Sequence, residues 1–166
     1  MRYLIDGYNL LFKSSKRKLS LENKRRALIE FLNELAKELS LQITVVFDGS
    51  SEDRAYLKSH FDRLELVYTE KKQSADDYIY EEVAHFPNKK NVTVVTSDRG
   101  LEQRCKLHGI EVYSISSFFQ LLQKKKGKKT RKSQAKNPFV ESPAEMTRLL
   151  MLFEKRFIES LQDHLE

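Results

Sequence analysis

The sequence predicts an α/β protein: a three-layer α/β/α sandwich built on a mostly parallel central sheet of about five strands, followed by a separate C-terminal helix. Two observations carry this prediction. Over residues 1–123, short β-branched runs alternate with segments of helical periodicity, as they do in strand–helix–strand crossovers. A lysine-rich tract without an apolar face then precedes one more amphipathic segment. We therefore expect a domain at 1–123, a basic linker at 124–141 and an amphipathic helix at 142–166.

Five runs are expected to form strands because they are rich in β-branched residues and are bounded by polar turns. The run QITVVFD is almost continuously apolar, which is typical of a strand covered by helices on both faces. The expected strands are 3–6, 42–48, 65–68, 91–98 and 110–114.

Segments of helical periodicity separate these strands. Residues 20–39 place leucines on one face at helical spacing, and Ser74 is suited to cap a helix over 74–86. Gly109 is placed to end another helix. The other expected helices are 99–108, 116–123 and 142–166, the last opened by the start signal Ser142, Pro143 and Glu145.

Length and composition exclude several classes of protein. A chain of 166 residues, 40% hydrophobic and 33% charged, is typical of one ordered globular domain. No apolar run approaches the roughly 20 residues of a membrane helix, and the N-terminal run is too short for a signal peptide. We therefore expect a cytoplasmic protein with no membrane partner. The single cysteine, Cys105, excludes an internal disulfide framework and is expected in the core.

The net charge of +6 originates in one short tract. Residues 1–123 hold 19 basic and 18 acidic residues, whereas 124–136 hold 8 basic residues and no acidic one. Such a tract fits an RNA- or ribosome-binding tail, and it equally fits a solubilising linker. The final helix either packs back on the domain or forms a dimer contact, so the sequence leaves monomer and homodimer open.

Aspartates end three of the expected strands. Asp6 follows YLI, Asp48 follows TVVF and Asp98 follows VVTS, while Asp76 and Asp77 open the helix after the third strand. Because the carboxyl ends of parallel strands line one crevice, we expect these side chains to converge on one rim. Converging carboxylates repel one another unless a cation neutralises them, and oxygen ligands suit Mg²⁺ or Mn²⁺.

The alternative is that each aspartate caps a helix or forms a turn, as single aspartates at strand ends commonly do. We expect the segments 7–9, after Asp6, and 49–51, after Asp48, to be loops first rather than helix starts. That expectation favours a metal site over four independent caps.

Four motifs appear in a fixed order: DGYNLL at 6–11, VVFDGS at 45–50, SADDYI at 74–79 and VVTSDRGLEQRC at 94–105. Together they resemble the motifs of the NYN domain, and most closely those of its bacterial YacP-like members. NYN domains belong to the PIN-like nuclease superfamily. The resemblance covers residues 1 to about 123 and implies a PIN-like fold that hydrolyses RNA phosphodiester bonds with a divalent metal.

The resemblance also implies the roles of the acidic residues. Asp6 and Asp76 match the central metal-binding carboxylates, and Asp98 matches the third. Asp48 matches the acid after the second strand, which binds either directly or through water. Adjacent helical residues point roughly 100° apart, so we expect Asp76 to face the metal and Asp77 to take an outer position in the same site.

Two further polar residues and several basic ones complete the expected site. Asn9 and Ser97 match family positions that orient ligands or the substrate phosphate, and we include them with Asp6, Asp76 and Asp98 in the catalytic set. Basic residues near the rim and in the lysine tract are expected to bind nucleic acid, although a solvated helix surface would also account for them. These are Lys13, Lys16, Arg17, Lys18, Lys24, Arg25, Arg99, Lys124, Lys125, Lys126, Lys128 and Lys129, with Arg26 and Arg104 nearby.

The resemblance therefore predicts a Mg²⁺- or Mn²⁺-dependent endoribonuclease, with RNA as its partner and a ribosome-associated role in mRNA decay as an extension. A non-catalytic RNA- or ribosome-binding factor that has kept the fold is the competing interpretation. A Mg²⁺-dependent phosphatase is a third, but such an enzyme would need a second acid two residues after Asp6, where Tyr8 stands.

Overall fold

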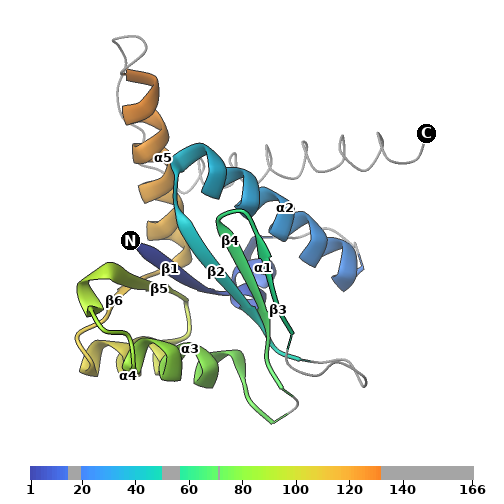
Figure 1. The fold of residues 1–166 in the computed structure, drawn as a ribbon, viewed down its shortest axis with the longest axis vertical. Helices are drawn as coiled ribbons and strands as arrows, with labels where there is room; N and C mark the ends of the chain where they lie inside the picture. Colours follow the sequence, from blue (N-terminus) through green and yellow to red (C-terminus); the bar gives the residue numbers. More distant parts are fainter. Residues whose placement is uncertain (15–19, 50–56, 71, 132–166) are drawn as a thin grey trace. The chain divides into compact units, whose positions relative to one another are not determined.

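The computed structural model describes residues 1–14, 20–49, 57–70 and 72–131 (Figure 1). The helix expected at 142–166 lies outside these ranges. The elements are β1 (Arg2–Asp6), α1 (Gly7–Ser14), α2 (Leu21–Leu39), β2 (Gln42–Phe47), β3 (Leu57–Phe61), β4 (Leu64–Tyr68), α3 (Ala75–Ala84), the one-turn 3-10 helix η1 (Lys89–Asn91), β5 (Val92–Val95), α4 (Arg99–Leu107), β6 (Glu111–Tyr113) and α5 (Ile115–Arg131). None of the helices in these ranges is long and apolar enough to span a membrane.

The strands form one sheet in the order β3-β4-β2-β1-β5-β6. All neighbours pair in parallel except β3, which runs antiparallel to β4. Helices α1 and α2 contact β2, whereas α3 packs on β1 and β2 and α4 packs on β6. The two helix pairs cover opposite faces of the sheet (Figure 1), which confirms the predicted α/β/α sandwich with a mostly parallel sheet.

The order of the strands fixes where a ligand can bind. From β1 the chain moves outward to β2 and then to the edge pair β3 and β4. After β4 it returns past β2 and β1 to reach β5 on the other side of β1. The crossovers on the two sides of β1 therefore lie on opposite faces of the sheet. In open α/β sheets, ligands bind beyond the carboxyl ends of the strands at this kind of switch point, here between β1 and β5.

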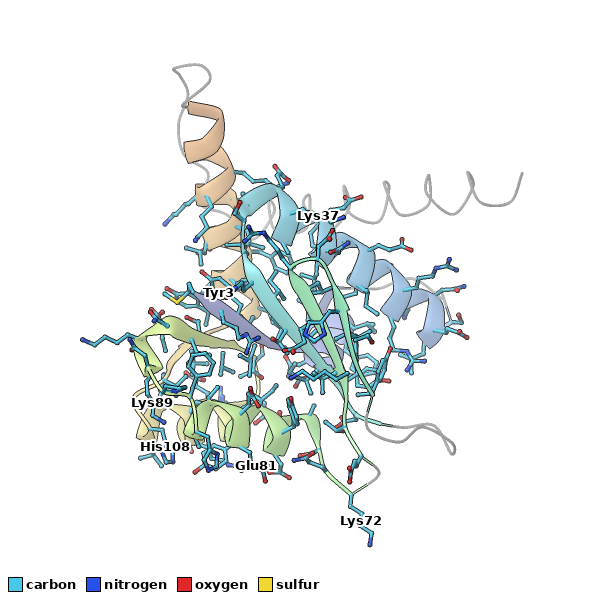
Figure 2. The ribbon with its side chains drawn as sticks, viewed as in Figure 1. Tyr3, Lys37, Lys72, Glu81, Lys89 and His108 are labelled. Atoms are coloured by element: carbon cyan, nitrogen blue, oxygen red, sulfur yellow. The ribbon has the colours of Figure 1, made fainter. Side chains whose placement is uncertain are left out.

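Alternating strand residues supply the two halves of the core. Leu4, Val46, Val67 and Val94 face α3 and α4, where Ile79 and Leu101 lie with Cys105 in one buried cluster. The placement of Cys105 in the core confirms that prediction. The other face buries, among others, Ile5, Val45, Phe47, Leu28 and Leu32. On β1, the ring of Tyr3 lies 5.3 Å from that of Phe118 at the start of α5 (Figure 2 labels Tyr3).

Three elements differ from the prediction. Residues 7–14 form α1 and not a loop, because the strand-end carboxylate of Asp6 accepts a hydrogen bond from Asn9 N and starts the helix at once. The strand β3 was not predicted, since LKSHF has few β-branched residues. It is held by the turn at Asp62, whose φ is 51°, and by Lys58, which lies 2.9 Å from the buried carboxylate of Glu65.

Helix α5 continues beyond its expected end at 123 to Arg131, so the first part of the predicted linker is helical. The chain divides into two compact units, Met1–Phe118 and Phe119–Glu166. The first unit contains the whole sheet, helices α1 to α4 and every aspartate of the predicted site.

Candidate metal and nuclease site

The topology brings the predicted carboxylates to one rim of the sheet. Asp6 is the last residue of β1, and β1 lies between β2 and β5. Asp48 follows β2, Asp98 lies at the start of α4 after β5, and Asp76 lies in the first turn of α3. Three strand ends and one helix start in the sequence therefore identified a group of residues that the fold brings to the same rim.

Asp6 is the most buried of these acids, with 9% of its surface exposed. Burial raises the pKa of its carboxyl from 3.8 to about 6. The backbone hydrogen bond from Asn9, 3.0 Å to Oδ1, opposes this shift, whereas the negative charges of Asp76 and Asp48 add to it. A buried carboxyl under such repulsion is stabilised in its charged form by any cation that binds beside it.

Asp76 is half-buried and is coupled to the same group. Burial is the largest cause of its raised pKa, followed by the charges of Asp98, Asp48 and Asp77, while Arg104 lowers it. The charges of Asp48 and Asp76 thus act on Asp6, and those of Asp48 and Asp98 act on Asp76, so that Asp6, Asp48, Asp76 and Asp98 form one electrostatic group. We call these four residues the acidic rim.

Three members of the acidic rim also cap helices. Asp6 Oδ1 accepts from Asn9 N in α1, and Asp98 Oδ1 accepts from Leu101 N in α4 at 2.8 Å. Asp48 Oδ1 accepts from Ala75 N, the first residue of α3, at 2.5 Å. The expectation that Asp6 is followed by a loop was therefore wrong, and capping does not argue against a metal site. A carboxylate has two oxygens and about four acceptor positions, so it can cap a helix and bind a cation.

Asp77 differs from its neighbour Asp76. Its Oδ1 accepts from Arg104 Nη1 at 2.9 Å, and its Oδ2 accepts from Ser74 Oγ at 2.9 Å. The hydrogen bond from Arg104 is the main reason that the pKa of Asp77 is lowered. Asp77 thus completes a reciprocal cap with Ser74, whose Oγ accepts from Asp77 N. The geometry agrees with an outer position and does not favour Asp77 as a direct ligand.

Arg104 is a residue whose role the sequence left open. Its guanidinium carbon lies 4.1 Å from the centre of the Tyr80 ring while its Nη1 bonds Asp77. The hydroxyl of Tyr80 in turn lies 2.7 Å from Nε2 of His108, the residue that follows α4. Figure 2 labels His108. These contacts join α3 to α4 next to the acidic rim and hold a positive charge near Asp76.

Asn9 connects two motifs that are far apart in sequence. Its side-chain Oδ1 accepts from Ser97 N at 3.1 Å, across 88 positions. Asp98 N donates to Thr96 Oγ1 at 3.0 Å in the same loop. The predicted polar pair Asn9 and Ser97 is therefore brought together, and through Asn9 the start of α1 fixes the loop that carries Asp98.

The donor set fits a hard divalent cation in its chemistry, because it consists of carboxylates whose mutual repulsion a cation would relieve. Within the described part of the chain, no three histidine, cysteine or acidic side chains form a ready-made metal cluster. Asp48 and Asp98 are both engaged in capping bonds in this structure. A metal at this rim would therefore need side-chain positions other than those seen here.

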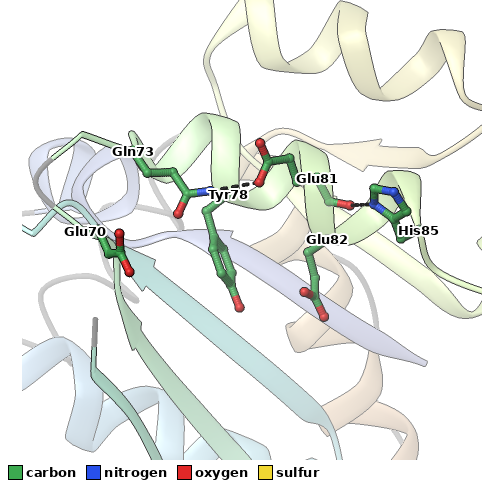
Figure 3. Close-up of a pocket in the computed structure, with 6 residues that line it drawn as sticks. All are labelled: Glu70, Gln73, Tyr78, Glu81, Glu82 and His85. Atoms are coloured by element: carbon green, nitrogen blue, oxygen red, sulfur yellow. Dashed lines mark hydrogen bonds between the residues drawn. The ribbon is translucent and has the colours of Figure 1, made fainter. Parts of the chain in front are cut away.

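A hollow of about 420 Å³ lies on the other side of α3 (Figure 3). Tyr78 and Glu82 point into it toward the sheet, and Glu81 accepts from Gln73 Nε2 at 2.8 Å (Figure 3). Glu70 and His85 complete the lining. None of the acidic rim lines this hollow, and we assign it no role.

The predicted nucleic-acid-binding residues that the structure describes lie on four helices, α1, α2, α4 and α5. Lys24, Arg25 and Arg26 lie in the first turns of α2, and Arg99 is exposed at the start of α4. Lys124–Lys126 lie in α5, together with the backbone of Lys128 and Lys129. Lys13 lies in the last turn of α1, which ends at Ser14, and the segment 16–18 lies outside the described residues.

Comparison with protein families matches residues 3–161 to the family described as the YacP-like NYN domain. The crystal structure of Rae1 (YacP) from Bacillus subtilis is similar, with a TM-score of 0.62 and 18% identity over 98% of this chain and 92% of that one. A structure of a tryptophan-to-leucine mutant of the same Bacillus subtilis protein gives a TM-score of 0.61 and 21% identity over 78% of this chain and 79% of that one. At these identities the two structures show the fold alone. No curated protein matches the sequence.

Proposed function

Because the chain belongs to the YacP-like NYN domain family, whose domains are nuclease-like, we propose that it is a divalent-metal-dependent endoribonuclease acting in the cytoplasm. One observation carries the proposal: the acidic rim gathers four aspartates at the switch point of the sheet, where burial and mutual repulsion raise the pKa of Asp6 and of Asp76. A cation bound beside these carboxyls would favour their charged forms and relieve the repulsion between them.

The residues of the rim have separable tasks in this mechanism. Asp6 and Asp76 would hold Mg²⁺ or Mn²⁺ with Asp98, and Asp48 would contribute while it keeps α3 in place. When bound, the metal would polarise the scissile phosphate, lower the pKa of an attacking water and offset charge on the leaving oxygen. Asn9 would hold the loop of Ser97 and Asp98 in register with Asp6.

A covalent route through the cysteine is disfavoured. Cys105 is fully buried, and burial raises the pKa of its thiol to about 11. A nucleophilic cysteine needs an accessible thiolate. Hydrolysis by an activated water is therefore the route that the described residues support.

The competing interpretation, a binding factor without catalysis, explains the acidic rim poorly. Negative charge gathered at a surface that approaches RNA weakens its attraction for the phosphate backbone. A protein that only bound RNA would gain nothing from these residues.

Cleavage of a mixed-sequence single-stranded RNA in Mn²⁺ tests the proposal. We expect cleavage by the wild type, no cleavage by the wild type in EDTA, and a large loss for Asp6→Asn, which replaces the carboxylate by an amide of the same shape. Equal cleavage in all three reactions would indicate a contaminating nuclease and contradict the proposal. Turnover of small phosphomonoesters instead of RNA would indicate a phosphatase.

The proposal extends to the ribosome as the place where RNA is presented. The family resemblance supports this extension, and the lysine-rich tract supplies the charge for it. Cleavage of the same message with and without translating ribosomes tests it. A rate that does not change when ribosomes are present would contradict the extension while leaving the nuclease proposal intact.

A further inference from the structure

We propose that an aromatic–arginine face beside the acidic rim, formed by Tyr8, Phe12, Arg25 and Tyr68, binds an unpaired nucleobase of the RNA substrate. The inference rests on the proposed nuclease function and names how the substrate is held. The aromatic–arginine face lies on the side of the sheet that α1 and α2 cover, whereas the acidic rim lies on the side that α3 and α4 cover.

The position of this face follows from the alternation of side chains along the strands. Val46 and Val67 point into the core under α3 and α4, so the next residues, Phe47 and Tyr68, point to the opposite face. Phe47 directly precedes Asp48 in the sequence. The same strand ends that present carboxylates to one side therefore present aromatic rings to the other.

The rings form a continuous series that ends at the surface. Phe47 stacks on Tyr68 with ring centres 5.6 Å apart, and Tyr8 meets Phe47 edge-on at 5.1 Å. Phe12 stacks on Tyr8 at 5.8 Å with an angle of 18° between the rings. Phe12 itself is 68% exposed, so one of the largest apolar side chains of the domain presents its ring to solvent on an ordered support.

Arg25 adds a fixed cation to the series. Its Nη1 donates to the Tyr8 hydroxyl at 3.3 Å, and its guanidinium carbon lies 6.0 Å from the centre of the Tyr68 ring. Lys24 and Arg26 flank it in the first turns of α2. Guanidinium planes and aromatic rings are the groups on which proteins stack unpaired bases, and the neighbouring charges suit a phosphate backbone.

A pocket of about 480 Å³ adjoins this face between α2 and β4. Arg25 and Tyr68 line it together with the apolar side chains of Ile29 and Leu66. Glu22, Arg26 and Glu30 lie at the same pocket, and Arg26 Nε is 3.4 Å from Glu30 Oε1. Asn33 also lines it, and its Oδ1 is buried with no hydrogen-bond partner in the described part of the chain. A planar apolar ring, such as the face of a nucleobase, would fill the space that Ile29 and Leu66 line.

The distance along the chain is also suitable for one RNA strand. Tyr8 and Phe12 lie two and six residues after Asp6, in the helix that begins at that carboxylate. At 1.5 Å per residue, the helix places Phe12 roughly 9 Å from the acidic rim, which is about one to two nucleotides of an extended strand. A phosphodiester at the aspartates would thus leave a neighbouring base within reach of the face.

Fluorescence anisotropy with a single-stranded RNA that contains one 2-aminopurine, measured in EDTA to prevent cleavage, tests the inference. Phe12→Ala should weaken binding by about fivefold or more and reduce the quenching of the 2-aminopurine, because a stacked base loses its support. Phe12→Tyr should keep both affinity and quenching. Leu107→Ala is the matched control, since Leu107 is an exposed apolar residue on α4, 87% exposed and away from this face.

Affinity and quenching by Phe12→Ala equal to those of the wild type would overturn the inference, and so would a wild type that does not bind this RNA. Mn²⁺-dependent cleavage by the wild type, measured separately, reports on the nuclease proposal alone. Binding that depends on Phe12 without any cleavage would support the aromatic–arginine face and contradict the nuclease proposal.

Discussion

Asp6 shows how one buried carboxylate can lower the stability of the folded protein and how a bound cation would offset that loss. Its carboxyl is nearly buried, its pKa is raised to about 6, and the charges of Asp76 and Asp48 contribute to that shift. In the unfolded chain the same group ionises at its ordinary value of 3.8. The folded protein therefore holds the proton more tightly than the unfolded chain between these two pKa values.

This difference predicts how stability depends on pH when no metal is present. Because the folded pKa is the higher one, the free energy of unfolding should fall as the pH rises from about 4 to 6 and then level off. Asp6→Asn removes the titrating group and should raise the free energy of unfolding by ~1–3 kcal/mol at pH 7.5, with little effect at pH 4. Urea denaturation in EDTA at both values measures it.

Mn²⁺ provides the control for this prediction. It should stabilise the wild type at pH 7.5, since a ligand that binds only the folded state shifts the unfolding equilibrium, and it should stabilise Asp6→Asn less. A variant that is destabilised at pH 7.5 in EDTA would contradict the account of Asp6 as a strained carboxylate.

The sequence could identify the acidic residues but not their separate contacts. Strand-end position was sufficient to place Asp6, Asp48 and Asp98 together, and the start of the following helix added Asp76. The bond between Asn9 and Ser97 spans 88 positions, so no local pattern could have shown it. The pairing of Arg104 with Asp77 likewise depends on how α3 and α4 pack.

At the scale of elements, the start of α3 is the part of the fold on which Asp76 depends most directly. Ser74 Oγ accepts from Asp77 N at 3.1 Å, and Asp48 Oδ1 accepts from Ala75 N. Together they satisfy backbone donors that the first turn of a helix cannot satisfy by itself. The direction in which Asp76 points is therefore set by this cap.

Ser74→Ala should lower the free energy of unfolding by about 1 kcal/mol and lower the cleavage rate at saturating RNA by at least about threefold, because Asp76 loses its fixed position. Ser20→Ala is the matched control, since Ser20 caps α2 with a similar bond to Asn23 N at 3.2 Å. It should cost similar stability and leave the rate unchanged. Equal loss of rate in both variants would show that the effect is one of stability alone.

Element prediction succeeded where the periodicity was long and failed where a side chain from another element decided the structure. The run over 20–39 and the strand over 42–48 have enough residues for their patterns to be clear, and both are present. Helix α1 is short and begins with glycine, and its start depends on the carboxylate of Asp6. Strand β3 is also short, so the alternation of its apolar and polar residues is a weak signal. Its place in the sheet depends on pairing with β4.

At the scale of the whole molecule, the charge of the chain is concentrated in the lysine-rich tract, part of which continues α5 to Arg131. A helix presents its lysines with a fixed spacing, which a flexible linker would not. The structure shows that residues 124–131 of this tract are helical, where the sequence predicted a linker.

Replacing Lys124, Lys125, Lys126, Lys128 and Lys129 by glutamine should weaken RNA binding and flatten its dependence on salt. Each lost phosphate contact reduces the slope of log K against log salt by about 0.7 for a single strand. Binding titrations at several salt concentrations measure the slope. Replacing the exposed Lys72 and Lys90 is the control and should leave it unchanged. An unchanged slope in the five-lysine variant would make the tract a spacer.

The measurement that tests the central claim most directly compares two adjacent acids in one helix. Asp76 belongs to the acidic rim, whereas the carboxylate of Asp77 is held by hydrogen bonds from Arg104 and Ser74. In single-turnover cleavage of RNA with saturating Mn²⁺, the account predicts a loss of at least about 100-fold for Asp76→Asn and of less than about tenfold for Asp77→Asn. Full activity of a folded Asp76→Asn, or an equal loss in both folded variants, would contradict it.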